Sequence, residues 1–287
     1  MRRSSGGRSW ASLIPATVVA LALGCGSPRP DALRIATTTS VDNSGLLDAL
    51  VPAFEQESGV NLQVIAVGSG QAFALGRRGD VALLLTHEPG GERALFDAGL
   101  VRHYRKIMFN RFVIAGPADD PARIAGAASA RDAMVRIATS GALFVSRGDA
   151  SGTHVREQQL WTSAGERPHA ARLIETGQGM APTLRVASQR GGYVLTDEAT
   201  LARLSDAVAL RALYSGDAAL LNTYAVVILT TAPSDTTTVA ERFAQWLAEG
   251  AGQNRIDGFR VKDRQVFFTW PANADRTAPE SMPPGVR

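Results

Sequence analysis

The sequence is poor in cysteine and histidine. Cys25 is the only cysteine among 287 residues, so the chain forms no internal disulfide, and a disulfide-stapled fold is excluded. His87, His103 and His169 show no metal-ligand spacing such as H-E-x-x-H, so the sequence contains no zinc-hydrolase motif of that type.

An excess of either charge is also missing. The chain has 30 lysines and arginines against 27 acidic residues, and without Arg2, Arg3 and Arg8 the basic count falls to 27. No basic stripe with interleaved aromatic residues occurs, so nucleic acid is not an expected partner. The glycine signatures GxxxxGK[ST] and GxGxxG are absent as well, so nucleotide binding is not indicated.

The long apolar run of the sequence lies near its N-terminus, at residues 11–23, after three arginines. This layout is typical of a secretory signal peptide, and the run is too short for a permanent membrane span. Cys25 follows at the position where the cysteine of a lipobox is acylated, so we predict a lipoprotein signal over 1–25 with Cys25 lipidated. One alternative is ordinary cleavage after Ala22, at the A-x-A site formed by Ala20, Leu21 and Ala22, and another is an uncleaved anchor helix.

Strand and helix signals alternate along the rest of the chain. Apolar runs such as 33–36 and 62–67 predict strands, and apolar residues at helical spacing over 46–57 predict a helix. Repeated strand–helix units favour an α/β fold with a parallel sheet covered by helices. About 260 residues follow the signal, which is too many for one compact sheet of this kind, so two lobes with a cleft between them are expected.

We expect the chain to cross between the lobes at strands 112–115 and 224–229. The Pro-rich polar end is expected to be a flexible tail. The predicted parts are a signal at 1–25, a linker at 26–32, lobe 1 at 33–111 plus 230–270, lobe 2 at 112–229 and the tail at 271–287.

Four loops between a strand and a helix are rich in small or hydroxyl residues: 37–40, 68–70, 146–153 and 176–179. The N-terminus of a helix has free N–H groups and a partial positive charge, and glycine lets a ligand approach the backbone closely. Such loops bind anions, and Arg147 adds a planar positive charge. Any one of them is more often a helix cap or a turn. Four loops, two in each half, favour an oxyanion cleft.

Short motifs in and around these loops resemble, in the same order, the tungstate-binding proteins of ABC importers. They include TTTS, VGSGQA, SRGD-x-SGTH, GQGM and YVLTD, which begin at residues 37, 67, 146, 177 and 193, and the similarity covers about 33–230. Ser69 stands where that family usually has threonine, and it keeps the hydroxyl; Arg111 stands where aspartate is usual.

The resemblance implies a two-lobed type II periplasmic-binding-protein fold with a ligand cleft between the lobes. It implies a solute-binding protein, not an enzyme, that captures tungstate or molybdate for an ABC transporter. No cofactor, resident metal or catalytic residue is expected. The expected partners are permease subunits and, through the lipid anchor, the membrane of the periplasm or cell envelope; a monomer is expected. The implied ligand-binding residues are Thr38, Thr39, Ser40, Gly68, Ser69, Gly70, Arg147, Ser151, Gly152 and Thr153.

Two alternatives are open. A phosphate-binding protein has similar loops, but protonated phosphate benefits from a carboxylate acceptor, whereas tungstate and molybdate are fully deprotonated. Asp149 therefore discriminates: a side chain in the cleft favours phosphate, and pairing with Arg147 or capping of the helix favours the other two anions. The more distant alternative is a hydrolase that uses Ser151 and His154, although no G-x-S-x-G elbow surrounds the serine.

Overall fold

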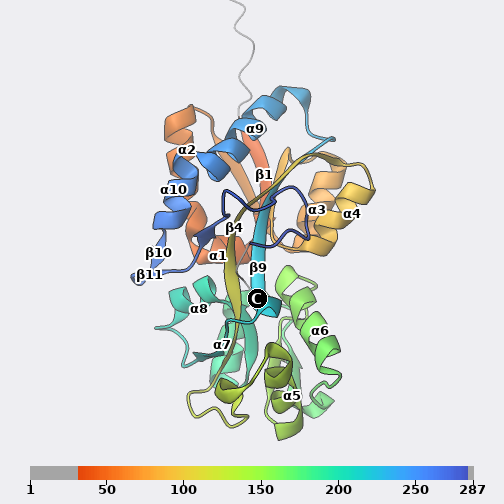
Figure 1. The fold of residues 1–287 in the computed structure, drawn as a ribbon, viewed down its shortest axis with the longest axis vertical. Coiled ribbons are helices and arrows are strands. Elements are labelled where there is room, and N and C mark those ends of the chain that lie inside the picture. The colour runs from red at the N-terminus through yellow and green to blue at the C-terminus, as the bar shows by residue number, and fades with distance from the viewer. Residues whose placement is uncertain (1–31, 284–287) are drawn as a thin grey trace, which may run out of the picture.

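The computed structural model describes residues 32–283, which form two lobes joined by two strands (Figure 1). The predicted signal peptide, Cys25 and the linker up to residue 31 lie outside the described residues, as do residues 284–287. Within 32–283, no helix is both long and apolar enough to cross a membrane.

Lobe 1 is built on a mixed sheet in the order β12-β4-β9-β3-β1-β2. β1, β2 and β3 are parallel because helices connect them, whereas β9 and β4 run antiparallel to their neighbours. In this sheet the predicted parallel pairing is found between the first three strands. The elements are β1 (Leu33–Thr38), α1 (Thr39–Ser44), α2 (Leu46–Ser58), β2 (Leu62–Val67), α3 (Ser69–Arg78), β3 (Leu83–Thr86), α4 (Pro89–Asp97), α9 (Ser234–Glu249), α10 (Ala251–Gly258), β10 (Arg260–Val261), β11 (Arg264–Gln265) and β12 (Phe268–Thr269).

Helices cover both faces of this sheet. Phe54 of α2, Phe243 of α9 and Ile256 of α10 belong to the core on one face, and Phe73 of α3 and Leu95 of α4 belong to the core on the other. Each helix buries its apolar stripe against the sheet, which is the layered arrangement that the alternating pattern predicts.

Lobe 2 is smaller and contains two apolar cores. Its β7 and β8 pair antiparallel with the far end of β4, and β5 pairs parallel with β6. The elements are α5 (Ala130–Ser140), β5 (Phe144–Ser146), α6 (Gly152–Ala164), β6 (Leu173–Glu175), α7 (Met180–Arg190), β7 (Val194–Asp197), α8 (Glu198–Leu204) and β8 (Arg211–Tyr214), with short 3₁₀ turns at Ile124–Gly126, Ala170–Arg172 and Ala218–Leu220.

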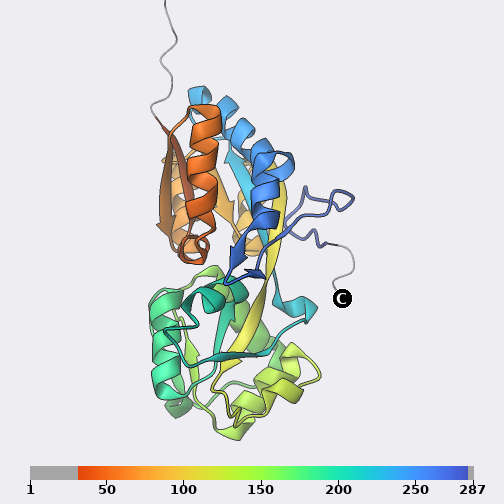
Figure 2. The same cartoon turned by 90° about the vertical axis from the view of Figure 1, so that its left-hand side faces the viewer.

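The two connecting strands are β4 (Val101–Gly116) and β9 (Leu221–Leu229). β4, yellow in Figure 2, runs through both lobes. It pairs with β9 as far as Arg111↔Leu221 and with β7 from Phe112 onward, so the crossing in β4 lies between residues 111 and 112. β9 pairs with β3 from Ala225 to Ile228, which places this part of β9 in the sheet of lobe 1. The predicted crossover at 224–229 and boundary after 229 therefore lie too late in the chain.

The segment after Trp270 packs against lobe 1 as far as the structure describes it. The backbone N–H of Lys106 donates to the carbonyl of Arg276 at 2.8 Å, and Arg93 forms an ion pair with Glu280. The prediction of a flexible tail is therefore wrong for residues 271–283, which are held against lobe 1. Its polar groups are hydrogen-bonded to the edge of lobe 1, a tertiary contact that composition alone does not reveal.

Candidate ligand site between the lobes

The four loops selected from the sequence meet where the lobes face each other. A cavity of about 480 Å³ lies between them. Both lobes contribute to it, and its lining is Thr39, Gly68, Gly70, Gln71, Arg147, Asp149, Ala150, Gly177, Gln178 and Gly179.

Two helices that begin at this cavity have glycine at the N-cap. Gly68 precedes α3 and Gly179 precedes α7, and neither has a side chain that caps the first N–H groups. Both helices have at least ten residues, so each carries a partial positive charge at this end. Uncapped N–H groups at the wall of a cavity are suited to an anion.

Two hydrogen bonds join the lobes beside the cavity. Nη1 of Arg147 donates to Oγ of Ser40 at 3.1 Å, and the backbone N–H of Gly152 donates to Oγ of Ser69 at 3.0 Å. Arg147 is only 2% exposed, although it carries a full charge. The loops of lobe 2 are therefore seated directly on those of lobe 1.

Asp149 lines the cavity, but its carboxylate is hydrogen-bonded within its own loop. Its Oδ2 accepts from Nε of Arg147 at 3.1 Å and also from Nη2, and its Oδ1 accepts from the backbone N–H of Ser151 at 3.1 Å. Both carboxylate oxygens are thus engaged within their own loop. Arg147 has five N–H donors, of which Asp149 and Ser40 use three, so two are left for a ligand.

Apart from Thr38, the other predicted residues divide into four groups. Thr39, Gly68 and Gly70 line the cavity, whereas Ser40, Ser69 and Gly152 make the bonds between the lobes. Ser151 caps α6, because its Oγ accepts from the backbone N–H of His154 at 3.3 Å. Thr153 is 1% exposed, and its Oγ1 has no partner among the described residues.

The side chain of Thr38 is committed elsewhere. Its Oγ1 accepts from the backbone N–H of Val41 at 3.3 Å and lies 3.0 Å from Nε2 of His87. Nδ1 of His87 lies 3.0 Å from Oδ1 of Asn222, a residue of β9. Burial lowers the pKa of His87 to about 4, so the ring is neutral at pH 7.

Several residues that line the cavity are not among the predicted ligand-binding residues. Gly177, Gln178 and Gly179 belong to the fourth loop, whose glycine-rich composition was visible, but the resemblance implied only the first three loops. His87 was missed because a single histidine after an apolar strand carries no recognisable pattern. Its partner Asn222 is 135 residues away in the sequence.

The geometry does not support the hydrolase alternative. Nδ1 of His154 accepts from the backbone N–H of Ala150 at 3.0 Å, and Nε2 lies 2.9 Å from the amide nitrogen of Gln158. Oγ of Ser151 bonds to the backbone of His154, not to its ring. A serine nucleophile needs a ring nitrogen at its hydroxyl, and here both ring nitrogens are occupied.

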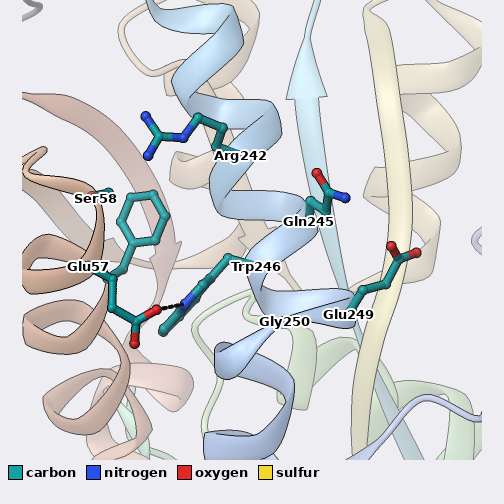
Figure 3. A pocket seen from close by; sticks show the side chains of 8 residues that line it. Glu57, Ser58, Arg242, Gln245, Trp246, Glu249 and Gly250 are labelled. Atoms are coloured by element: carbon teal, nitrogen blue, oxygen red, sulfur yellow. Dashed lines mark hydrogen bonds between the residues drawn. The ribbon is translucent and has the colours of Figure 1, made fainter.

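A second cavity lies on lobe 1, between α2 and α9, with a volume of about 360 Å³ (Figure 3). Trp246 forms one wall, and its Nε1 donates to Glu57 at 2.7 Å. None of the four loops contributes to its lining. Its lining has two acidic side chains, Glu57 and Glu249, against one basic side chain, Arg242, a balance that disfavours an anion.

Comparison with known proteins places this geometry in context. A family model described as a PBP superfamily domain matches residues 26–250. A putative ABC transporter anion-binding protein of Haloferax volcanii is 39% identical over 243 residues, which cover 82% of this chain and 71% of that protein.

Two solved structures are similar in fold and sequence. One is the tungstate ABC transporter from Geobacter sulfurreducens, with a TM-score of 0.74 and 38% identity over 80% of this chain and 99% of that one. The other is the tungstate-binding protein TupA from Desulfovibrio alaskensis G20, with a TM-score of 0.73 and 39% identity over 83% and 98% of the two chains.

Proposed function

Because this chain belongs to the PBP superfamily, we propose that it is a solute-binding protein that captures tungstate for an ABC importer. Molybdate has the same charge and shape and is the second candidate ligand. The resemblance read from the loop motifs is confirmed by the family match and by the tungstate-binding relatives. These relatives are transport proteins, in agreement with the expectation that the chain is not an enzyme.

The observation that carries the choice of ligand is the engagement of Asp149. Phosphate at neutral pH keeps a proton and gains from a free carboxylate acceptor, whereas a fully deprotonated dianion is repelled by one. Asp149 belongs to the cavity wall, but its Oδ2 accepts from Arg147 and its Oδ1 accepts from the N–H of Ser151, so each carboxylate oxygen already has a donor from its own loop. The cavity then offers uncapped N–H groups and the remaining donors of Arg147, an arrangement that supports a dianion without a proton.

The proposal also covers the partners of the protein and its location in the cell. ABC-transporter binding proteins deliver their ligand to a permease, so permease subunits are the proposed partners. A binding protein that supplies an importer takes up its ligand outside the cytoplasm, and the N-terminal residues 1–25 have the layout of an export signal. We extend the proposal to a lipid anchor at Cys25 and a monomeric protein in the periplasm or cell envelope.

Calorimetric titration of the purified protein with tungstate, molybdate, sulfate and phosphate tests the proposal. Tungstate and molybdate are expected to bind with similar affinity, and phosphate at least a hundredfold more weakly. Tight phosphate binding with no response to tungstate would replace the proposed ligand by phosphate. No binding of any of the four anions would overturn the assignment of the cavity.

A further inference from the structure

His87 lies next to the first ligand loop and contacts three parts of the molecule. It follows β3 in lobe 1 and is 4% exposed. Its ring nitrogens face Thr38, at the start of the first ligand loop, and Asn222, on connecting strand β9. A Cβ atom built on Gly152, from lobe 2, would lie 3.1 Å from Cε1 of the ring, which shows that lobe 2 rests against the imidazole.

The hydrogen bonds around Asn222 favour one tautomer of this ring. The amide nitrogen of Asn222 donates to Oδ1 of Asn110 and to the hydroxyl of Tyr224, each at 2.8 Å. Its Oδ1 is therefore the atom that faces His87 and acts as an acceptor, so Nδ1 of His87 carries the hydrogen. In a neutral imidazole Nε2 is then an acceptor, and the hydroxyl of Thr38 donates to it.

These hydrogen bonds set the orientation of the Thr38 side chain. Its hydroxyl hydrogen points to His87, and one lone pair accepts from the N–H of Val41. Thr38 therefore has no donor left for an anion and acts as a fixed support. The next two residues, Thr39 at the cavity wall and Ser40 in contact with Arg147, take their positions from it.

We infer that His87 is a positioning residue of the anion site, which ties the first ligand loop to the strands that connect the lobes. Asn110 belongs to β4 and Asn222 to β9, so the hydrogen-bonded chain runs from the ligand loop to both connecting strands. Gly152 touches the ring only when lobe 2 is seated on lobe 1. The ring thus holds the loop in the geometry that the closed site requires. The role rests on the proposed oxyanion binding.

A double-mutant cycle tests the role. His87→Gln and Thr38→Val are each expected to weaken tungstate binding about tenfold, the effect of one lost hydrogen bond. If His87 acts through Thr38, the double variant also loses about tenfold, because the second change has nothing left to remove. A loss near a hundredfold, or unchanged affinity in His87→Gln, would overturn the inference. His103→Gln makes the same chemical change on the outer part of lobe 1 and is expected to bind as the wild type does.

A second measurement needs no variant and no ligand. Nitrogen-15 NMR of the histidine rings distinguishes the two neutral tautomers, and His87 is expected to be protonated on Nδ1 at pH 7. Protonation on Nε2 instead would make His87 the donor and Thr38 the acceptor in their hydrogen bond, and would overturn the inference. Absence of tungstate binding in the wild type would overturn the proposed function, but the tautomer would still report on the chain of hydrogen bonds.

Discussion

The backbone N–H of Gly152, at the start of α6, donates to the hydroxyl of Ser69, at the start of α3, over a distance of 3.0 Å. One residue belongs to lobe 2 and the other to lobe 1, so this bond exists only while the lobes are in contact. A Cβ atom on Gly152 would lie 3.4 Å from that hydroxyl oxygen and 3.1 Å from Cε1 of His87. The contact between the lobes is thus tight at this position, and a methyl group would press most closely on the imidazole of His87.

Gly152→Ala is therefore expected to weaken closure and, with it, tungstate binding by about tenfold, because the ring of His87 must shift to admit a methyl group. Small-angle scattering is expected to show a smaller radius of gyration for the wild type with tungstate than without it, and a smaller change for the variant. Ligand at a hundredfold excess over Kd is expected to stabilise the wild type by about 2.7 kcal/mol. An alanine variant with wild-type affinity would show that the close contact is not needed for binding.

Arg147→Ala is expected to weaken tungstate binding by about ten- to a hundredfold, because a charge-assisted contact in a buried site contributes about 1.5–3 kcal/mol. The apo melting temperature is also expected to fall somewhat, since Asp149 loses the partner that neutralises it.

Asp149→Asn is the matched control for Arg147→Ala. It keeps the size of the side chain and an acceptor for the N–H of Ser151, so tungstate affinity is expected to change less than threefold, on the order of half a kcal/mol. Calorimetry and thermal melting of both variants check the pair of predictions. Normal affinity in Arg147→Ala would remove Arg147 from the site.

The two-lobed fold and the loops that meet at the cavity could be predicted from the sequence, whereas parts of the strand pattern could not. The four loops could be found because hydroxyl and glycine residues directly after apolar strands form a local pattern, and three of them supply residues to the cavity wall that were predicted to bind the ligand. The first half of β4 could not be found, because it contains the exposed Arg102 and the partly buried Arg105, and its buried Lys106 reads as a surface residue. Lys106 is buried because Glu92 and Thr223 contact its ammonium group, at 3.5 and 2.7 Å. Contacts of this kind join residues more than ten positions apart, and periodicity does not register them.

Cys25→Ser is expected to release the protein from the membrane fraction to the soluble fraction, if Cys25 carries the lipid anchor. The residue lies outside the described part of the structure, so the prediction rests on the signal layout of the sequence. Fractionation with an antibody checks it, and the variant is expected to keep its affinity for tungstate. Equal retention of the variant in the membrane fraction would contradict the anchor without affecting the assignment of the ligand.

His87 is expected to make the fold sensitive to acid. Its pKa is lowered from 6.5 to about 4, mainly by burial, and the nearby charges of Arg147, Arg156 and Lys106 lower it further. The unfolded chain therefore binds more protons between pH 4 and 6.5, so the free energy of unfolding falls as pH falls through this window. His87→Gln is expected to remove this pH dependence, which amounts to a change of up to about 3 kcal/mol in the free energy of unfolding across the window. Urea unfolding at a series of pH values checks it, with exposed His169→Gln as the control.

Glu157 is expected to act in the opposite direction. It lies on α6, is 1% exposed, and burial raises the pKa of its carboxyl from 4.5 to about 7. Here the folded chain binds more protons than the unfolded one, so the stability present below pH 4.5 is lost as pH rises to about 7. Glu157→Gln keeps the shape and removes the charge, so the variant is expected to gain stability over the wild type from pH 5 to pH 8, by up to about 3 kcal/mol. Urea unfolding of both proteins across this range measures the difference, and exposed Glu166→Gln serves as the control.

Between pH 4.5 and 6.5 the slopes from Glu157 and His87 oppose each other in the wild type, so its stability is expected to vary less with pH there than that of either single variant. A difference between Glu157→Gln and the wild type that stays constant from pH 5 to pH 8 would show that this carboxyl titrates at its ordinary pKa.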